Sequence, residues 1–238
     1  MDAKLQRDIT YLKGVGPKRA EVFKKVGVET VYDLLQYCPR DYIDLSQPQE
    51  LRSITPGGDE PVAVRVRLVK KLPTARIRKG LTISKAVFTD DTADITVTLY
   101  NQDYTFGNMK EDKQYVLYGK VTGSFIRLEM SAPMIFPGDS EDLIMPVYPL
   151  TEGLTQNYIR KVVKSALDLL GGEAEDVMPK YILDKSGLPS LLYAWENVHF
   201  PRSVYGAVEA RRRLIFDEFM IYTLAIAFRR ARGDEHSD

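Results

Sequence analysis

Alternating apolar and polar positions between Pro61 and Tyr104 predict three β-strands. The first strand, Pro61–Lys71, directs four apolar side chains to one face (Val62, Val64, Val66 and Leu68) and two arginines to the other (Arg65 and Arg67). The third, Asp94–Asn101, repeats the pattern, with Ile95, Val97 and Leu99 inward and Thr96, Thr98 and Tyr100 outward. Turn-forming residues at 90–93 precede it. The pattern predicts a sheet with one buried face and one solvated face.

Two more strands are expected further along the chain. Gln114–Val121 and Phe125–Met130 carry strand-forming residues on either side of a turn at Thr122–Ser124, and Asn101–Lys110 fits a short helix or a loop. Five short strands with such an insertion after the third are typical of an OB-fold, a small β-barrel. We therefore expect an α+β protein with a five-stranded OB-fold at 61–137. That fold binds oligonucleotides on strands two and three and on adjoining loops, of which the first is Leu72–Gly80 here.

Helical spacing of apolar residues on both sides of this region divides the chain into three parts: helices at 1–56, the barrel at 61–137 and helices at 150–238. Residues 41–56 show little periodicity and are expected to form a linker. Thr155 caps a helix that Gly171 and Gly172 end, and short helices are expected at Pro179–Leu183 and Leu188–Trp195.

The last helix, about Ser203–Arg230, is apolar on all sides over Phe219–Phe228 and therefore requires burial on several sides. We expect part of this surface to be exposed in the chain alone, which favours self-association of an otherwise monomeric protein. The run Arg211–Arg213 at its start either contacts DNA or, as we favour, forms ion pairs with the acidic region before it.

A glycine turn lies in the first helical region. Pro17 suits the first position of a helix that continues through Phe23 and ends at Gly27, and Thr30 with Asp33 starts a second helix. This order of helix, Gly-x-Gly turn and helix resembles the helix-hairpin-helix family, in which glycine amides and a lysine hold DNA phosphate without sequence preference. The resemblance implies phosphate contacts at Lys13, Gly14, Gly16 and Lys18. The alternative is a small helical packing unit with a glycine hinge.

Charge is unevenly distributed, although the net charge of the 238 residues is zero. Pro137–Phe200 carries ten acids against five basic residues, whereas Pro61–Thr89 contains no acid. That basic block contains Arg65, Arg67, Lys70, Lys71, Arg76, Arg78, Lys79 and Lys85. Nucleic-acid binding would therefore depend on a local patch.

Composition limits which other classes of protein this chain can belong to. One cysteine and two distant histidines give no internal disulfide and no zinc-ligand spacing. The first twenty residues lack the apolar segment of a signal peptide, and the longest apolar run, Phe219–Phe228, is too short to cross a bilayer. We expect a cytoplasmic protein without membrane contact.

Basic and aromatic side chains on the solvated face of a sheet are typical of a nucleic-acid platform. Tyr100 lies on that face and Tyr104 follows four residues later, so both rings are candidates to stack on bases. The alternative is an ordinary half-buried sheet whose two tyrosines pack on neighbouring loops.

Segments along nearly the whole chain resemble the RecG family of ATP-dependent DNA helicases in order and spacing. The most specific are Pro149–Leu154 (PLTEGL) and Ala210–Glu218 (ARRRLIFDE). Weaker similarities cover Leu12–Tyr42, Tyr100–Tyr104, Tyr118–Lys120 and His199–Pro201. The resemblance is to the N-terminal part of that family, which holds an OB-fold "wedge" at the branch point of replication forks and recombination junctions.

The resemblance implies that two aromatics of the wedge stack on bases where the strands part, while a basic hairpin helps to separate them. It matches those aromatics to Tyr100 and Tyr104. Asp103 stands where the family often has proline, which predicts a looser turn before Tyr104.

No loop of the form Gly-x4-Gly-Lys-Ser/Thr occurs in the sequence, and the family's motor would begin after the arginine-rich helix. We therefore expect a truncated chain that binds branched DNA, hydrolyses no ATP and takes no cofactor, whereas the full-length family uses ATP and Mg²⁺ in DNA repair and recombination. The expected location is the cytoplasm, at the nucleoid. The alternative is a protein-interaction module whose OB-fold and last helix dock a partner, with incidental DNA contact.

Overall fold

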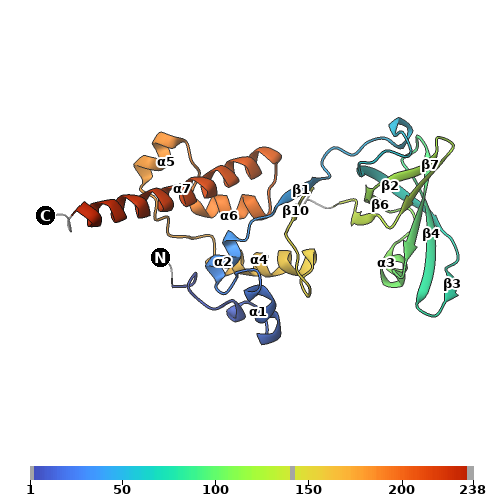
Figure 1. The fold of residues 1–238 in the computed structure, drawn as a ribbon. Helices are drawn as coiled ribbons and strands as arrows, with labels where there is room; N and C mark the ends of the chain where they lie inside the picture. Colours follow the sequence, from blue (N-terminus) through green and yellow to red (C-terminus); the bar gives the residue numbers. More distant parts are fainter. Residues whose placement is uncertain (1–2, 140–142, 235–238) are drawn as a thin grey trace. The chain divides into compact units, whose positions relative to one another are not determined.

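The computed structural model describes residues 3–139 and 143–234, which form a mixed α+β protein with a curled sheet (Figure 1). The chain divides into two compact units. The helical unit combines Met1–Ile43 with Ile144–Asp238, and the sheet unit is Asp44–Leu143. Each unit has its own hydrophobic core.

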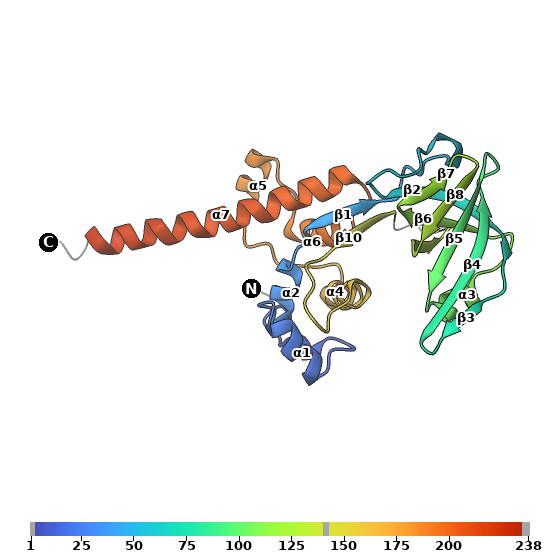
Figure 2. The ribbon, with the colours of Figure 1, turned by 45° about the vertical axis from the view of Figure 1, so that its right-hand side comes forward.

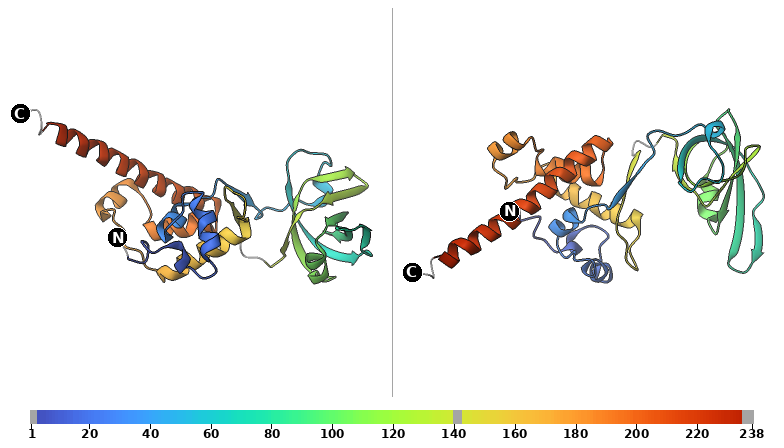
Figure 3. Two further views of the ribbon diagram at one scale, coloured as in Figure 1. Left: turned by 60° about the horizontal axis from the view of Figure 1, so that its bottom comes forward. Right: turned by 45° about the horizontal axis from the view of Figure 1, so that its top comes forward.

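The sheet unit is built from eight strands. They are β2 (Val62–Lys71), β3 (Ala75–Arg78), β4 (Leu81–Thr89), β5 (Asp94–Tyr100), β6 (Gln114–Gly119), β7 (Val121–Ser124), β8 (Arg127–Ser131) and β9 (Met134–Pro137). Their order is β7-β8-β5-β4-β2-β6-β9, with β3 paired to β4, and every pair is antiparallel except β5 with β8. Since only Lys120 separates β6, which pairs with β2, from β7, which pairs with β8, the sheet curls on itself (Figures 2 and 3).

The predicted faces of the sheet are confirmed. Six of the side chains predicted to point inward are fully buried and share one core with Phe88 and Met130: Val64, Val66, Leu68, Ile95, Val97 and Leu99. Val62, at the start of β2, is half-buried and packs against the same core. On the opposite face of β5, Thr96 and Thr98 are half-buried and Tyr100 is exposed. Two-residue periodicity was sufficient to orient these strands because each buries only one face.

Two segments expected to be loops contain strands. The expected first loop, Leu72–Gly80, includes β3, and the expected turn Thr122–Ser124 is part of β7, so that the hairpin tip lies at Phe125 and Ile126. Strand pairing satisfies backbone N–H and C=O groups whatever the side chains are. Side-chain composition alone therefore does not show where a basic or small-residue segment continues a ladder.

The expected linker 41–56 also has structure. It contains β1 (Asp41–Asp44), which pairs with β10 (Ile144–Val147), and the 3-10 turn η2 (Leu51–Ser53). Leu51 and Ile54 are buried in the core of the sheet unit. The carboxylate of Asp90 accepts from the amide of Leu51 at 2.6 Å. Burial acts to raise the pKa of Asp90, but this bond and those from Thr92 outweigh it and hold the pKa below its usual range.

The helical unit contains η1 (Ile9–Tyr11), α1 (Pro17–Lys24), α2 (Val31–Gln36), α4 (Gln156–Leu170), α5 (Lys180–Ser186), α6 (Leu191–His199) and α7 (Val204–Asp234). Several predicted helix ends are confirmed: Thr30 and Asp33 form a capping box, Thr155 caps α4, and Gly171 ends α4 in the left-handed region at φ 67°. The helices from the two ends of the chain share one core, which includes Phe23, Leu34, Ile159 and Trp195. The residues up to Ile43 and the helices from α4 onward thus share one unit, whereas residues 44–56, expected to belong to the N-terminal part, belong to the sheet unit.

The expected helix-hairpin-helix order is not found. Among residues 3–16 the structure has only the three-residue η1 before the glycine turn, and both α1 and α2 come after it. The side chain of Asp8 accepts from the amide of Thr10, and Leu12 is extended, so the chain leaves η1 before an α-helix develops.

Helix α7 extends well beyond the rest of its unit (Figures 1 and 2). Its first half packs against α6, with Ala207, Ala210 and Leu214 buried. Large apolar residues of its second half are exposed: Phe219, Ile221, Tyr222, Leu224, Ile226 and Phe228. This agrees with the expected exposure of part of the apolar run.

Candidate nucleic-acid interface

Two tyrosines stand out from the sheet unit where β5 ends. Tyr100, the last residue of β5, is 43% exposed and pairs across the sheet with Ile83. Tyr104 is 86% exposed and belongs to the short helix α3 (Asp103–Asn108). Both rings therefore offer an aromatic surface to solvent, and neither is covered by a neighbouring loop as the alternative interpretation requires.

A hydrogen-bonded corner fixes the chain between these rings. Asn101 adopts the left-handed region at φ 53°, and its amide donates to the carbonyl of Thr82 at 3.0 Å. The amide of Thr82 donates to Oδ1 of Asn101 at 2.8 Å, and the hydroxyl of Thr82 donates to Oδ1 of Asp103 at 2.8 Å. The looser turn expected from Asp103 is therefore not found: its carboxylate anchors the start of α3.

A basic hairpin lies beside this corner. Strands β3 and β4 meet at Lys79 and Gly80, and Gly80 has φ 83°, a conformation that glycine adopts without strain. Arg76, Arg78 and Lys79 are exposed on the hairpin, and Ile77 between them is 59% exposed. Helix α3 and β3 lie at the same end of the sheet unit in both views (Figures 1 and 2).

A shallow groove runs between the hairpin and the corner. It is lined by Arg76, Lys79, Gly80, Leu81, Thr82, Asn101 and Asp103. Two cations and one carboxylate give it a net positive charge, and the carboxylate is already bonded to Thr82. The groove suits an anionic backbone such as a phosphodiester chain better than a neutral small molecule.

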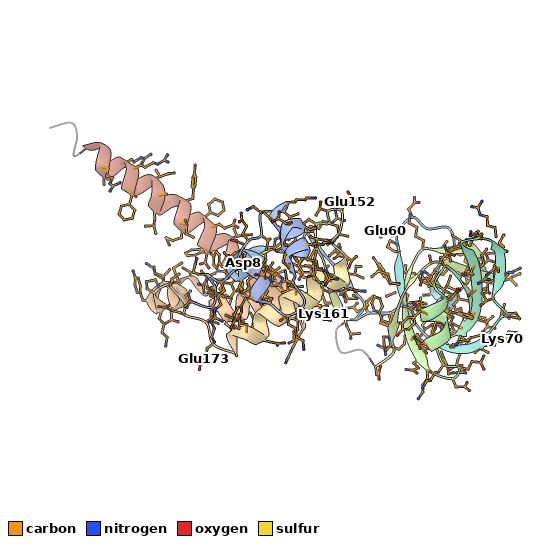
Figure 4. The ribbon with its side chains drawn as sticks, turned by 90° about the horizontal axis from the view of Figure 1, so that it is seen from below. Asp8, Glu60, Lys70, Glu152, Lys161 and Glu173 are labelled. Atoms are coloured by element: carbon orange, nitrogen blue, oxygen red, sulfur yellow. The ribbon has the colours of Figure 1, made fainter. Side chains whose placement is uncertain are left out.

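Two lysines extend the positive surface along the outer face of the sheet. Lys85 on β4 pairs with Thr98, two residues before Tyr100 on β5, and Lys70 on β2 pairs with Val87. Both lysines are exposed, and the side chain of Lys70 points away from the sheet (Figure 4). Within residues 3–139, no ion pair with a carboxylate involves Arg76, Arg78, Lys79, Lys70 or Lys85.

Three other predicted phosphate contacts have partners inside the sheet unit. Arg65 donates to the carbonyl of Gly138 at 2.8 Å. Arg67 donates to Asp91 at 2.9 Å and to Asp112 at 3.5 Å. Lys71 donates to the carbonyl of Gly107 and lies over the ring of Phe106. These contacts occupy the three side chains in the free protein, so we rank them below the hairpin as candidates for DNA binding.

The four candidates near the glycine turn belong to the helical unit. Lys13, Gly14, Gly16 and Lys18 are all exposed, and a side chain at either glycine would meet nothing within 4 Å. The carbonyl of Gly14 accepts from Arg19 and from the hydroxyl of Tyr158, both at 3.0 Å. These bonds hold the turn in place, and the open space above it leaves phosphate binding sterically possible.

The three arginines at the start of α7 differ from one another. Arg213 is fully buried and donates to Asp176, which lies in the acidic region that we favoured as the partner of this run, and to Asp217 of α7 itself. Arg212 donates to the carbonyl of Ser186 at 2.7 Å, and Arg211 is exposed.

Sequence reasoning missed Thr82 and Ile77 as members of the site. Ile77 breaks a basic run and could have been noticed as an exposed apolar residue in a hairpin. No local signal marks Thr82, because its partners lie 19 and 21 residues further along the chain. For other chemistries, the described residues contain no cluster of three or more histidine, cysteine or acidic side chains able to hold a metal ion, and none of the described helices is long and apolar enough to cross a membrane.

Several known proteins are similar in sequence to this chain. Residues 8–170 match the family model described as the RecG wedge domain. The chain is 32% identical to the ATP-dependent DNA helicase RecG of Thermotoga maritima, over 98% of this chain and 30% of that protein. It is 31% identical to the RecG of a Synechocystis species, over 89% of this chain and 28% of the relative.

A solved structure is also similar. "Structure of RecG bound to three-way DNA junction" aligns with a TM-score of 0.82 and 30% identity, over 99% of this chain and 33% of that one. The chain spans about a third of the length of the relatives that it matches. On the match across residues 8–170, which covers most of its length, this chain belongs to the RecG wedge domain family.

Proposed function

We propose that this chain binds branched DNA, such as replication forks and recombination junctions, through its sheet unit. Tyr100 and Tyr104 stack on bases at the branch point, and the cations of the β3–β4 hairpin, Arg76, Arg78 and Lys79, neutralise phosphates next to them. The observation that carries the proposal is the exposure of both rings, 43% and 86%, beside a basic hairpin whose cations form no ion pair among the described residues.

The exposed rings favour branched over linear DNA for a physical reason. In a continuous duplex the base faces are stacked on one another, so a protein ring finds no free face. At a branch point the last base of each arm has a free face, and stacking of one base on an aromatic side chain contributes about 1–3 kcal/mol. Contacts to phosphate are made equally well with either DNA and supply affinity without selectivity.

The pairing of the strands supports assignment of the sheet unit to the OB-fold. β2, β4 and β5 form an antiparallel meander, β8 lies parallel to β5, and the segment β6–β7 pairs with β2 through one half and β8 through the other. This gives a five-stranded barrel when β6 and β7 are counted as one bent strand. In this assignment the hairpin occupies the loop between the first two strands, which is one of the ligand-binding loops of the fold.

The relatives support a wider role. A RecG protein has been solved bound to a three-way DNA junction, and the curated relatives are ATP-dependent DNA helicases. We infer that this chain acts as the wedge portion of such a helicase in DNA recombination and repair, at the bacterial nucleoid. ATP and Mg²⁺ would act on a motor outside these residues, and this chain itself would use no cofactor.

The test compares a three-way junction, a fork and a linear duplex of matched length, each at two salt concentrations. The wild-type chain should prefer the branched DNAs, and its affinity for all three should fall with salt. The double variant Tyr100→Ala, Tyr104→Ala should lose roughly thirtyfold or more for branched DNA, which corresponds to about 2 kcal/mol for two stacked bases, and little for the duplex. Equal losses on branched and linear DNA would contradict the stacking role.

The exposed second half of α7 favours a second candidate, a protein-interaction module with incidental DNA contact. This candidate predicts that removal of residues from Phe219 onward abolishes binding to the partner while charge reversal at Arg76, Arg78 and Lys79 does not. A chain that lacks these residues but still binds junctions selectively would favour the DNA proposal.

A further inference from the structure

Thr82 joins the basic hairpin to the tyrosine corner and lies between the parts of the proposed interface. On one side it pairs with Arg76 of β3. On the other side its backbone and hydroxyl bond to Asn101 and Asp103, which both lie between Tyr100 and Tyr104, at distances of 2.8–3.0 Å. Thr82 also lines the groove between the two elements.

The bonds to Asn101 explain how the chain leaves the sheet immediately after Tyr100. In an antiparallel ladder, a hydrogen-bonded pair exchanges two N–H···O=C bonds. Here the amide of Asn101 makes one of them, but the second acceptor is the side-chain Oδ1 of Asn101 and not its backbone carbonyl. The carbonyl is released from the ladder, and Asn101, at φ 53°, turns the backbone away from the strand.

The bond to Asp103 then directs the start of α3, which carries Tyr104. This helix has only six residues, none of them fully buried, and its N-cap residue Gln102 makes no side-chain capping bond. A helix this short is not stable by itself, so its orientation depends on tertiary contacts. The hydroxyl of Thr82 supplies a charge-assisted contact at its first residue, and Phe106 packs on the core at its other end.

We propose that Thr82 is a positioning residue that sets the spacing between Tyr100, Tyr104 and the hairpin cations, and thereby the preference for branched DNA. The inference rests on the function proposed above. A rigid corner places both rings before DNA arrives, so binding does not have to order them. Without the hydroxyl, α3 loses this anchor and moves relative to β5, so that the two rings no longer hold their spacing.

The experiment uses the full chain with Thr82→Val, which keeps the shape and the strand propensity but removes the hydroxyl. We expect a fall of roughly fivefold in the ratio of three-way-junction affinity to duplex affinity, with duplex affinity unchanged. Thr82→Ser, which keeps the hydroxyl, should restore the ratio. Thr96→Val, at an outward threonine of the neighbouring strand β5, is the matched control and should leave the ratio unchanged.

A second readout reports on the rings directly. A junction with 2-aminopurine at the branch point should be quenched on binding by the wild-type chain and by Thr82→Ser, and less by Thr82→Val. Asp103→Ala should reduce the quenching as much as Thr82→Val does. The variant that carries both substitutions should show no further reduction, since each of them removes the same hydrogen bond. An additive loss, or no change in the ratio for Thr82→Val while the tyrosine variant loses junction binding, would overturn the positioning role.

The two proposals can fail separately. If the tyrosine double variant keeps its junction preference, the stacking function is wrong whatever Thr82 does. If Thr82→Val lowers junction and duplex affinity equally, together with the melting temperature, its role is only structural and the inference is overturned.

Discussion

The hydroxyl of Tyr148 and Nδ1 of His199 lie 2.9 Å apart in the core of the helical unit, where both side chains are buried. The other ring nitrogen of His199, Nε2, lies 3.0 Å from the backbone carbonyl of Leu35, which can only accept. Nε2 therefore carries the proton, and Nδ1 accepts from Tyr148. The folded state thus holds His199 as a neutral ring with both nitrogens satisfied.

This arrangement predicts a loss of stability in mild acid. Burial lowers the pKa of His199 to about 4 from an ordinary value of 6.5, against the opposing effect of the bond to Leu35. The unfolded chain takes up a proton on this histidine as the pH falls below 6.5, whereas the folded chain does not until near 4. The stabilisation is therefore complete above 6.5 and is lost between 6.5 and 4, by about 3 kcal/mol in total.

Chemical denaturation of the full chain at a series of pH values measures this effect. His199→Gln, whose amide does not titrate, should flatten the curve over that interval even if it lowers stability at neutral pH. An NMR titration of the ring in the wild-type protein provides an independent check: a midpoint near 6.5 for His199 would contradict the burial argument.

The buried ion pairs of Arg213 lead to a second prediction. Its guanidinium binds Asp176 with two nitrogens at 2.7 and 2.9 Å, Asp217 at 2.9 Å, and the carbonyl of Pro189 at 2.6 Å. Arg213→Met would leave both carboxylates without their cation inside the unit, and removal of one partner of a buried pair costs about 3–5 kcal/mol. The midpoint of urea denaturation should fall accordingly. Arg212→Ala is the control, because that side chain is largely exposed, and a similar loss in both variants would refute a special role for Arg213.

The salt dependence of DNA binding distinguishes the hairpin from the other basic residues. Each neutralised phosphate contributes about 0.9 to the slope of log affinity against log salt for duplex DNA. Replacement of Arg76, Arg78 and Lys79 by alanine should therefore reduce the slope by up to roughly 2.7. Arg67→Ala should change it little, since Asp91 and Asp112 already neutralise that arginine. A larger effect from Arg67 than from the hairpin would show that phosphate binds elsewhere.

Arg67 also illustrates what the sequence could and could not predict. Alternation along β2 correctly directs Arg67 to the solvated face, as it directs Val66 and Leu68 to the core. The partners of Arg67 come from two turns, 24 and 45 residues further on, and no pattern within the strand indicates them. Strand orientation is a local property, whereas charge pairing depends on how distant turns meet.

The candidate site likewise contains residues that the sequence could predict and residues that it could not. Tyr100 was predictable on the outer face because Leu99 and Val97 alternate with it, and the family resemblance drew attention to Tyr104. The contribution of Thr82 was not predictable, since its bonds join strands that only the folded sheet brings together. Similarly, Arg213 was distinguishable from Arg211 only once the packing of α7 on α6 was known.

Exposed apolar residues on α7 lead to the last prediction, concentration-dependent self-association. With 100° between successive residues, they form two stripes on opposite sides of the helix: Phe219, Tyr222 and Ile226 on one, and Ile221, Leu224 and Phe228 on the other. Full burial of one such side chain contributes about 1.5–3 kcal/mol. If a second copy covers even one stripe of three side chains, this burial offsets a large part of the entropy cost of association. Sedimentation velocity over a range of protein concentrations should show a shift from monomer to a larger species.

Serine at all three positions of one stripe should weaken the association, and serine at both stripes should abolish it. Tyr205→Ser, at an exposed residue near the start of the same helix, should have no effect. A single monomeric species at every concentration would contradict the prediction.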